Sequence, residues 1–502
     1  MKIERKNLIK SLFVLAAVIC IVSIIIHQDT AKSMSDSENP ASQAKAIIEK
    51  ADLKGGLIVH LNCGEGKVTE ALRLNDSYLV HGLDSNGDNV KKAREHIASK
   101  GKYGPISVDR LTGNRLPYTD NMVNLIVAEK LGDISMSEVM RVLTPNGVLM
   151  TKNAGDWRKS VKSWPEEMDE WNQYLYDAGN NPVSKDLTIS PVEHYQWVGS
   201  PMWGRHHDVT SSLSALVSAN GRIFYIMDEG PKESVQLPAE NYLYARDAFN
   251  GTILWKKAIP EWQDHMFPMK SGPAYLPRRL VAKGDKVYVT LGIDAPLSEL
   301  DAATGKVLRT FDGTDETSEI LLSDNTLFLV VGRPEKTDKK YTSTKTYVWD
   351  RGAEARNEWA WSKEPCKIMS LDMKSGKPNW TKEYPIGPLS LSADAKSVYF
   401  YNGTSLVRLD RSSGKEKWQS APIKTKKYDT AYAPRLVVSD GVLVFSVGGN
   451  GDFAAGSMMA LSAENGQKLW NSAQPFSGHY SPEDIFVIDG VVWTGNIAWG
   501  QA

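Results

Sequence analysis

The sequence predicts a multidomain chain, with an α/β domain first and an all-β domain of the β-propeller class after it. Between about residues 42 and 153, short apolar runs alternate with segments of helical periodicity, which is typical of a parallel sheet with crossover helices. From about residue 196 the pattern changes to short strands separated by Gly, Asn and Asp turns, and one motif recurs. A chain of 502 residues is long enough to hold both domains.

The overall charge gives no sign of a nucleic-acid partner. The chain has 59 Lys and Arg residues against 60 Asp and Glu residues, so no global field favours nucleic acid or an anionic membrane. The three cysteines, Cys20, Cys63 and Cys366, cannot form a disulfide framework. We expect Cys63 and Cys366 to be small buried side chains.

The N-terminus sets the expected compartment. Residues 1–10 are basic, residues 11–26 form an apolar run without charge, and a polar stretch follows. This order is typical of a signal peptide or a short uncleaved membrane anchor, which we assign to residues 1–35. We therefore expect an exported, periplasmic or membrane-anchored protein.

The stretch between the two domains predicts a connector. Residues 154–195 contain one segment with the spacing of an amphipathic helix and end in a region rich in Pro and Asn. We expect a helical connector here, with the α/β domain assigned to 42–153 and the propeller to 196–502.

One turn motif recurs five times in the second domain. Its copies are ARDAFNGTILW, ELDAATGKVLR, SLDMKSGKPNW, RLDRSSGKEKW and ALSAENGQKLW, beginning at residues 245, 299, 370, 408 and 460. Each copy reads as a strand, a turn with Gly where the backbone needs a positive φ, and a second strand. Another strand pair precedes each copy, so the repeat predicts one four-stranded sheet per blade of a β-propeller. Five blades are complete, and the chain begins a sixth.

The repeat resembles the A-x-D-x-x-T-G-x-x-x-W motif of quinoprotein (PQQ-type) propellers, from residue 196 to the end. Trp255, Trp380, Trp418 and Trp470 match the final position, and Arg309 replaces it in the second copy. The resemblance implies that these side chains pack between neighbouring blades and do not bind a quinone. It also implies an eight-bladed ring in full, so we interpret the chain as a fragment; an unusual ring closure is the alternative.

The quinoprotein resemblance leaves the activity open. In quinoprotein dehydrogenases PQQ lies on the ring axis with Ca²⁺ and a pair of adjacent cysteines, and this sequence has no such pair. PQQ and Ca²⁺ are therefore implied by the resemblance only. The same repeat also builds non-catalytic propellers, such as the scaffold lipoprotein of outer-membrane assembly, and the fold alone does not choose between them.

Two stretches of the second domain gather side chains that could form a site. WGRHHD supplies two histidines and an aspartate at residues 206–208, and we favour a histidine bonded to the backbone over a site. Residues 263–279 gather a histidine, a lysine, Arg278 and Arg279. We interpret this second stretch as a solvated basic loop, with an anion-binding rim as the alternative.

Residues 56–152 resemble the class I S-adenosylmethionine-dependent methyltransferases of the small type 11 kind. IVHLNCGEG matches V-L-D-L-G-C-G-x-G, YLVHGLDSN matches the second strand with its final acid, and SEVMRVLTPNGVLM matches E-x-x-R-V-L-K-P-G-G-x-L. The resemblance implies a Rossmann-like fold with S-adenosylmethionine as its cofactor.

The resemblance assigns a cofactor site to the first loop and the end of the second strand. Gly64 and Gly66 let the backbone approach the cofactor, while Asn62 replaces a third glycine and tolerates left-handed backbone. Asp84 stands where the family's acid accepts the ribose hydroxyls; a turn or helix-start aspartate is the alternative. Asp109 is the candidate for the adenine contact, although it precedes the family's position by several residues.

Other positions depart from the family's pattern. His60 replaces an aspartate that helps to hold the cofactor's ammonium group, and a neutral imidazole carries no negative charge. Asn124 replaces a second aspartate, and the chain leaves the pattern after residue 153, without the family's final antiparallel strands. An exported domain would also not normally meet this cytoplasmic cofactor. We therefore interpret the domain as degenerate.

The leading hypothesis places the function in the propeller. It acts either as a binding scaffold or as a quinoprotein-type redox module, with an unidentified small molecule or protein at its face. One alternative is an active S-adenosylmethionine-dependent methyltransferase whose acceptor the propeller recruits; another is a non-catalytic structural interaction protein. No residue is predicted as catalytic or metal-binding, and a membrane contact is expected if the leader is uncleaved.

Overall fold

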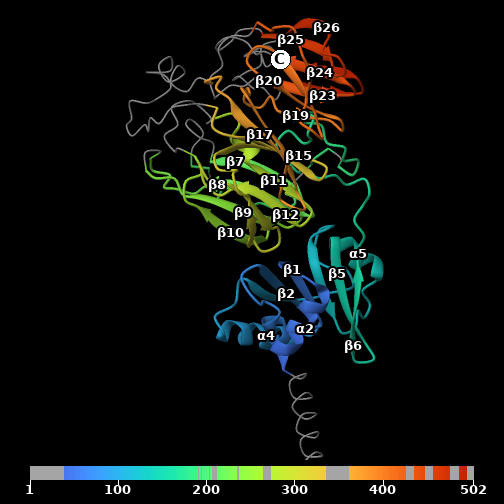
Figure 1. Ribbon diagram of the computed structural model, residues 1–502. Helices are drawn as coiled ribbons and strands as arrows, with labels where there is room; N and C mark the ends of the chain where they lie inside the picture. Colours follow the sequence, from blue (N-terminus) through green and yellow to red (C-terminus); the bar gives the residue numbers. More distant parts are fainter. Residues whose placement is uncertain are drawn as a thin grey trace, which may run out of the picture. The chain divides into compact units, whose positions relative to one another are not determined.

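The computed structural model describes residues 39–494, apart from 190, 194, 203, 206–211, 235–236, 264–272, 335–360, 425–434, 447–455 and 475–484. The chain divides between Trp164 and Pro165 into two compact units, each described by itself below (Figure 1). The predicted leader at 1–35 and the histidines of the WGRHHD stretch lie outside the described residues. Within the described part of the chain, no helix is both long and apolar enough to cross a membrane.

The first unit is an α/β domain built on one six-stranded sheet. Its elements are α2 (Pro40–Ala51), β1 (Gly56–Leu61), α3 (Lys67–Ala71), β2 (Tyr78–Asp84), α4 (Gly87–Ser99), β3 (Ile106–Arg110), β4 (Val123–Ala128), α5 (Met136–Val142), β5 (Leu143–Asn153) and β6 (Asp156–Val161). The strand order is β3-β2-β1-β4-β5-β6, and every pair is parallel except β5 with β6. The Rossmann-like fold predicted from the sequence is confirmed.

The strand residues alternate between two cores, one on each face of the sheet. Ile58 and Val80 pack with the buried sides of α2 and α4, whereas Val59 and Ile126 pack with Val139 of α5. This alternation follows from the period of two along a strand, which sends successive side chains to opposite faces. Both faces of the parallel sheet are therefore covered, and its strand ends are left to form the candidate cofactor loop.

The sheet continues past residue 153, where we expected the chain to leave the fold. Ala154 and Gly155 form a turn with positive φ angles of 49° and 94°, and β6 returns antiparallel to β5, pairing Asp156 with Asn153. This strand carries no periodic signal in the sequence, because its side chains are almost all exposed and apolar and polar residues do not alternate.

The second unit contains five four-stranded antiparallel sheets and one two-stranded sheet in its described residues. The first three blades are β7 (Leu213–Ala219), β8 (Arg222–Asp228), β9 (Asn241–Asp247) and β10 (Ile253–Ile259); β11 (Leu280–Lys283), β12 (Lys286–Thr290), β13 (Leu297–Asp301) and β14 (Val307–Thr310); and β15 (Thr317–Ser323), β16 (Thr326–Val331), β17 (Cys366–Asp372) and β18 (Pro378–Tyr384). The others are β19 (Ser392–Ala393), β20 (Ser397–Tyr401), β21 (Leu406–Asp410) and β22 (Glu416–Gln419); β23 (Arg435–Ser439), β24 (Val442–Ser446), β25 (Gly456–Ser462) and β26 (Lys468–Gln474); and the pair β27 (Ile485–Ile488) and β28 (Val491–Thr494). A short 3₁₀ helix, η1 (Leu276–Arg279), precedes β11. One sheet per repeat confirms the predicted propeller.

The repeated turn joins each blade to the one before it. Gly305 has a φ of 69°, and a Cβ atom added to it would lie 2.7 Å from the indole ring of Trp255. That indole donates its Nε1–H to the carbonyl of Ala302 at 2.9 Å. The same arrangement joins Trp380 to the turn of Gly414, Trp418 to that of Gly466, and Arg309 to that of Gly376. The predicted structural role of these side chains is confirmed.

Trp197 makes the equivalent contact with the first blade, although it lies outside the five repeat copies. Its Nε1–H donates to the carbonyl of Ala248 at 3.0 Å, and a Cβ atom on Gly251 would lie 2.4 Å from its ring. Trp470, the tryptophan of the fifth copy, is by contrast 37% exposed. The repeat motif therefore identifies the docking turns, but it does not identify every side chain that docks on them.

No helix occurs among the described residues of 154–195, so the predicted helical connector is wrong. After β6 the described residues up to 195 form turns, bends and irregular backbone, with Gln173, Leu175 and Asn180 buried. Hydrogen bonds to the propeller strands take the place of helical ones, because backbone groups buried there must find a partner.

Candidate functional site

The predicted cofactor loop follows β1 and has the backbone that its residue types favour. Asn62, Gly64 and Gly66 have φ angles of 54°, 57° and 78°, in the left-handed region that Gly and Asn adopt most easily. Gly66 also has no room for a side chain, because an added Cβ would lie 2.8 Å from the Cβ of Ala93 in α4. The sequence pattern thus produces the tight turn into α3 that it predicts.

Asp84 ends β2, is 5% exposed, and lies beside the loop. Its Oδ2 accepts the Gly64 N–H at 2.8 Å and its Oδ1 accepts the Asn86 N–H at 2.9 Å. The side-chain amide of Asn89 lies 3.3 Å from both oxygens. A carboxylate offers about four acceptor positions, and three donor groups of this domain already use most of them. The hydrogen bond from Asn86 is the kind that a turn aspartate accepts, and a turn aspartate was the alternative role for Asp84.

His60 is buried in β1 beneath the loop. Its Nδ1 forms a hydrogen bond with the hydroxyl of Thr69 at 2.9 Å. Burial lowers the pKa of His60 to about 4, although the carboxylates of Glu129 and Asp84 oppose this shift. The imidazole is therefore neutral at pH 7, and this position supplies no charge to attract an ammonium group.

The two asparagines that depart from the methyltransferase pattern make structural hydrogen bonds. The Asn62 side-chain amide donates to the carbonyl of Lys130, just after β4, at 3.1 Å. The Oδ1 of Asn124 accepts the Leu57 N–H at 2.8 Å, and Gly56 leaves the space that this side chain fills. Both side chains therefore hold neighbouring parallel segments in register.

Asp109 bonds to different partners from the other predicted cofactor residues. It lies near the end of β3, where its carboxylate pairs with Arg94 of α4 and lies 3.1 Å from the Nε2 of His81. The hydroxyl of Tyr118 lies 2.6 Å from the other ring nitrogen of His81. Burial lowers the pKa of His81, against the opposing effect of Asp109. Gly64 and Asp84 are thus brought together, whereas Asp109 joins a helix to a strand.

The centre of the propeller is the second candidate site. The first strands of successive blades contact one another, β7 with β11, β11 with β15, β19 with β23 and β23 with β27, so they line the centre. Residues 171–181, here called the axial segment, run along these strands. The carbonyl of Trp171 accepts from Ser218 of β7 at 2.7 Å, and that of Asn172 accepts from Ala282 of β11 at 2.9 Å. The segment therefore begins against the first and second blades.

The rest of the axial segment bonds to the remaining blades. The Gln173 side chain exchanges two hydrogen bonds with Leu322 of β15, at 2.8 and 2.7 Å. The carbonyls of Ala178 and Gly179 each accept a backbone N–H at 2.7 Å, from Ala393 of β19 and Val438 of β23 respectively. Asn181 exchanges two bonds with Val487 of β27, at 2.8 and 2.9 Å. The axial segment therefore occupies the centre beside all six described sheets of the second unit.

Buried charges surround the end of the axial segment. Arg278 is 1% exposed, donates to the Asn180 side-chain oxygen and to the carbonyl of Leu391 at 3.3 Å, and lies 4.0 Å from Glu319. Burial raises the pKa of Glu319, and the Arg278 guanidinium opposes that shift. The Asn180 amide donates to the carbonyls of Leu391 at 3.0 Å and Leu436 at 2.9 Å. These groups fix the segment in place.

Neither interpretation of residues 263–279 is correct for its two arginines, which form neither a solvated basic loop nor an anion-binding rim. Arg279, like Arg278, is buried, and it donates to backbone carbonyls and to the hydroxyl of Thr290 while lying over the ring of Trp262. Because η1 turns both side chains inward, the two guanidinium groups bond to groups inside the second unit. The histidine and the lysine of the stretch lie outside the described residues.

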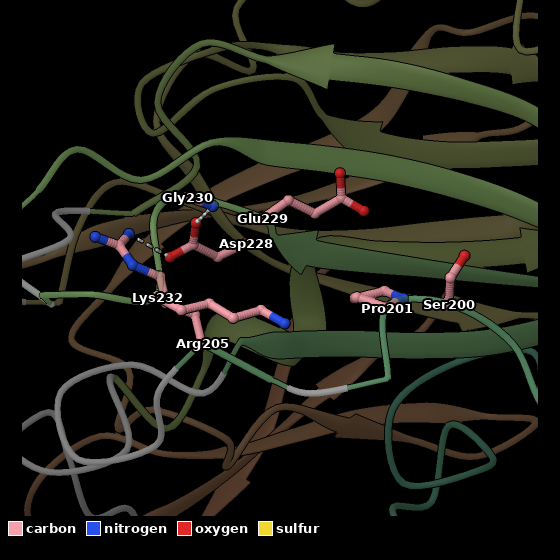
Figure 2. A pocket seen from close by; sticks show the side chains of 7 residues that line it. All are labelled: Ser200, Pro201, Arg205, Asp228, Glu229, Gly230 and Lys232. Atoms are coloured by element: carbon pink, nitrogen blue, oxygen red, sulfur yellow. Dashed lines mark hydrogen bonds and ion pairs between the residues drawn. The ribbon is translucent and has the colours of Figure 1, made fainter.

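A cavity of about 270 Å³ lies beside the first blade. It is lined by Ser200, Pro201, Arg205, Asp228, Glu229, Gly230 and Lys232. Figure 2 shows the Arg205 guanidinium facing the Asp228 carboxylate, at 3.0 Å, while the Gly230 N–H donates to the same carboxylate at 2.8 Å. Arg205 also donates to backbone carbonyls of Pro231 and Ser234. These groups satisfy one another and hold the loop after β8, which indicates a structural role.

The sequence analysis did not identify Asn89, which bonds to Asp84, or the residues that fill the propeller centre. Asn89 lies five residues after Asp84 in the first turn of α4, and its position after the acid was the available signal. The carboxamides of the axial segment are visible in the sequence as NQ and NN, but their partners lie far away in the chain. In the described ranges, no group of three or more His, Cys, Asp or Glu side chains is placed to hold a metal.

Comparison with known proteins supports both halves of the chain separately. A family model described as "Methyltransferase domain" matches residues 58–147. A solved S-adenosylmethionine-dependent methyltransferase from Aquifex aeolicus is 20% identical, covering 22% of this chain and 62% of that one, with a TM-score of 0.20. An uncharacterized protein from Haemophilus influenzae is 24% identical over 199 residues, 38% of this chain and 68% of that protein.

The second comparison concerns the propeller. BamB from Moraxella catarrhalis is 16% identical, covering 52% of this chain and 61% of that one, with a TM-score of 0.31. The chain thus spans less than two thirds of either solved structure. A family model described as "Outer membrane protein assembly factor BamB" matches residues 239–501, more than half of the 502 residues. The chain therefore belongs to the family of that description and carries a methyltransferase-like domain before its PQQ-type propeller.

Proposed function

We propose that the propeller is a protein-binding scaffold on the exported side of a membrane, and that the α/β domain keeps its fold without using a cofactor. The observation that carries this proposal is the axial segment, which fills the propeller centre with the chain's own backbone. A propeller whose centre is filled in this way has its outer surfaces left for partners. The matched family's description as an assembly factor agrees with such a role.

The described centre does not fit PQQ. A flat quinone on the axis, as the quinoprotein resemblance implies, needs an open slot between the first strands of the blades. Here the carbonyls of Ala178 and Gly179 bond directly to two of these strands, and Asn180 is fully buried between them. Redox chemistry of the quinoprotein kind is therefore not part of the proposal.

The α/β site also fits S-adenosylmethionine poorly as it stands. The loop glycines and Asp84 are of the right type, but the acceptor positions of Asp84 face Gly64, Asn86 and Asn89. His60 is neutral where a negative charge would attract the ammonium group. A ribose diol would have to displace the Asn89 amide, which supports the interpretation of a degenerate site.

Calorimetric titration of the full chain with S-adenosylmethionine is expected to give no heat at millimolar ligand. The His60→Asp/Asn89→Ala double variant is expected to bind it in the micromolar to submillimolar range. The new carboxylate attracts the ammonium group, and the truncation frees acceptor positions on Asp84. Adding Asp84→Ala to the double variant should abolish this binding. PQQ with Ca²⁺, titrated in parallel, is expected to give no heat.

Micromolar binding by the unsubstituted chain would contradict the proposal in one of two ways. If S-adenosylmethionine bound and Asp84→Ala removed the binding, the second candidate function, an active methyltransferase with the propeller as its recruiting module, would replace it. The specific feature that favours this candidate is the preserved contact between Gly64 and Asp84. If PQQ bound, a redox role for the propeller would replace the scaffold role.

A further inference from the structure

The order of contacts along the axial segment follows the order of the blades. Trp171 and Asn172 bond to the first and second sheets and Gln173 to the third. Ala178 and Gly179 bond to the fourth and fifth, and Asn181 bonds to the last described pair. A flexible linker would have no reason to reach each described sheet of this unit in turn. The regular order indicates a recognition surface that extends around the inner edges of the blades.

The side chains of the segment copy the hydrogen bonding of a strand. The carboxamides of Gln173 and Asn181 each donate to the carbonyl and accept from the N–H of one strand residue, as a paired backbone would. Asn180 bridges two blades by donating to the carbonyls of Leu391 and Leu436. Addition of an extended peptide to a sheet edge uses the same groups.

The fit between segment and blades is close. A Cβ atom on Gly179 would lie 2.4 Å from the carbonyl oxygen of Val438, so the backbones approach as near as only glycine allows. Leu175 and Tyr176 have φ angles of 65° and 70°, an unfavourable conformation for such side chains. Tyr176 is held there by donating its hydroxyl to Asp169 at 2.7 Å. The segment therefore adopts a strained course that the surrounding contacts impose.

We propose that the centre of this propeller is a peptide-binding site and that residues 171–181 are its ligand, bound permanently in cis. The site recognises a peptide that turns, since residues 174–179 are turns and bends, through the inner edges of the first strands and through carboxamides at three positions of the peptide. By bonding to each described sheet, the ligand holds the blades together from the inside. This inference rests on the same axial segment as the scaffold proposal, but different results overturn the two: release of the excised segment overturns the inference, whereas binding of S-adenosylmethionine or PQQ overturns the proposed function.

Cutting the chain on both sides of the axial segment tests this inference in the folded protein. Protease recognition sequences are inserted into the full chain at Glu166–Glu167 and at Thr188–Ile189, where the residues are exposed. After cleavage, the released species are separated by gel filtration under native conditions and identified by mass. Chains with one recognition sequence each serve as controls for the insertions.

The proposal expects the excised peptide to elute with the propeller and to separate only in denaturant. A second variant, with Asn181→Ala added, removes the bonds to Val487 and is expected to release the peptide at least tenfold faster. Elution of the peptide by itself, beside a propeller that keeps its near-ultraviolet circular dichroism, would overturn the inference. Equal release from both double-cut chains would also overturn it, because the carboxamide would then contribute nothing to recognition.

Discussion

Replacing Asn180 with alanine is expected to lower the free energy of unfolding of the propeller by about 4 kcal/mol, or to prevent its folding. Asn180 is fully buried, and its side chain bonds to Leu391, Leu436 and Arg278. Alanine leaves two carbonyls and a buried guanidinium without these bonds, and a buried group left unpaired costs about 1–3 kcal/mol. Its φ of 63° adds strain, because alanine adopts this region less easily than asparagine.

Guanidinium unfolding followed by tryptophan fluorescence measures this effect. All but two of the 15 tryptophans lie after residue 164, so the signal reports mainly the second unit. Asn379→Ala is the matched control, because Asn379 lies exposed on β18 and donates to the Ser370 hydroxyl at 3.2 Å. The control should change the free energy of unfolding by less than about 0.5 kcal/mol. Equal effects of the two substitutions would mean that the axial segment does not stabilise the blades.

Trp380→Ala is expected to cost about 4 kcal/mol of the free energy of unfolding, the usual range for a large buried aromatic side chain. Trp380 is 8% exposed, donates its Nε1–H to the carbonyl of Arg411 at 2.9 Å, and covers the turn glycine of the next blade. Its removal opens a cavity at the seam between the third and fourth blades. The same unfolding measurement applies.

Trp470→Ala provides an unusually close control. Trp470 holds the same position of the repeat motif but is 37% exposed in the described structure. Its truncation should therefore cost less than about 1 kcal/mol. If Trp470→Ala destabilised the protein as much as Trp380→Ala, then Trp470 would be buried in solution against something other than the described residues.

The sequence predicted the parts of the fold that depend on local or repeated patterns. The apolar runs around Val59 and Ile126 are long enough to identify the parallel strands, and the turn glycines require a positive φ wherever they recur. The exposed strand β6 and the docking of Trp197 were missed, since neither carries a pattern that repeats. Local periodicity also predicted a helix in the connector, but long-range hydrogen bonds determine its course.

The candidate sites were predictable only in part, for the same reason. Residue types at the end of β1 and β2 identified Gly64 and Asp84, whose contact the structure contains. The role of Asn89 depends on how the first turn of α4 faces Asp84, which spacing alone does not give. Arg278 looked like a solvated loop residue because its partners, Asn180 and Leu391, lie about a hundred residues away on either side.

Hydrogen exchange on the full chain tests the central claim, that the axial segment fills the propeller centre as a fixed part of the fold. The amides of Ser218, Ala282, Leu322, Ala393, Val438 and Val487 donate to this segment. We predict that these amides, together with residues 171–181, exchange as slowly as the strands of the blades. The exposed residues 112–115, whose amides donate none of the described hydrogen bonds, serve as the internal reference for fast exchange. Exchange of residues 171–181 at the rate of that reference would contradict the account, because the propeller centre would then be open to solvent and to ligands.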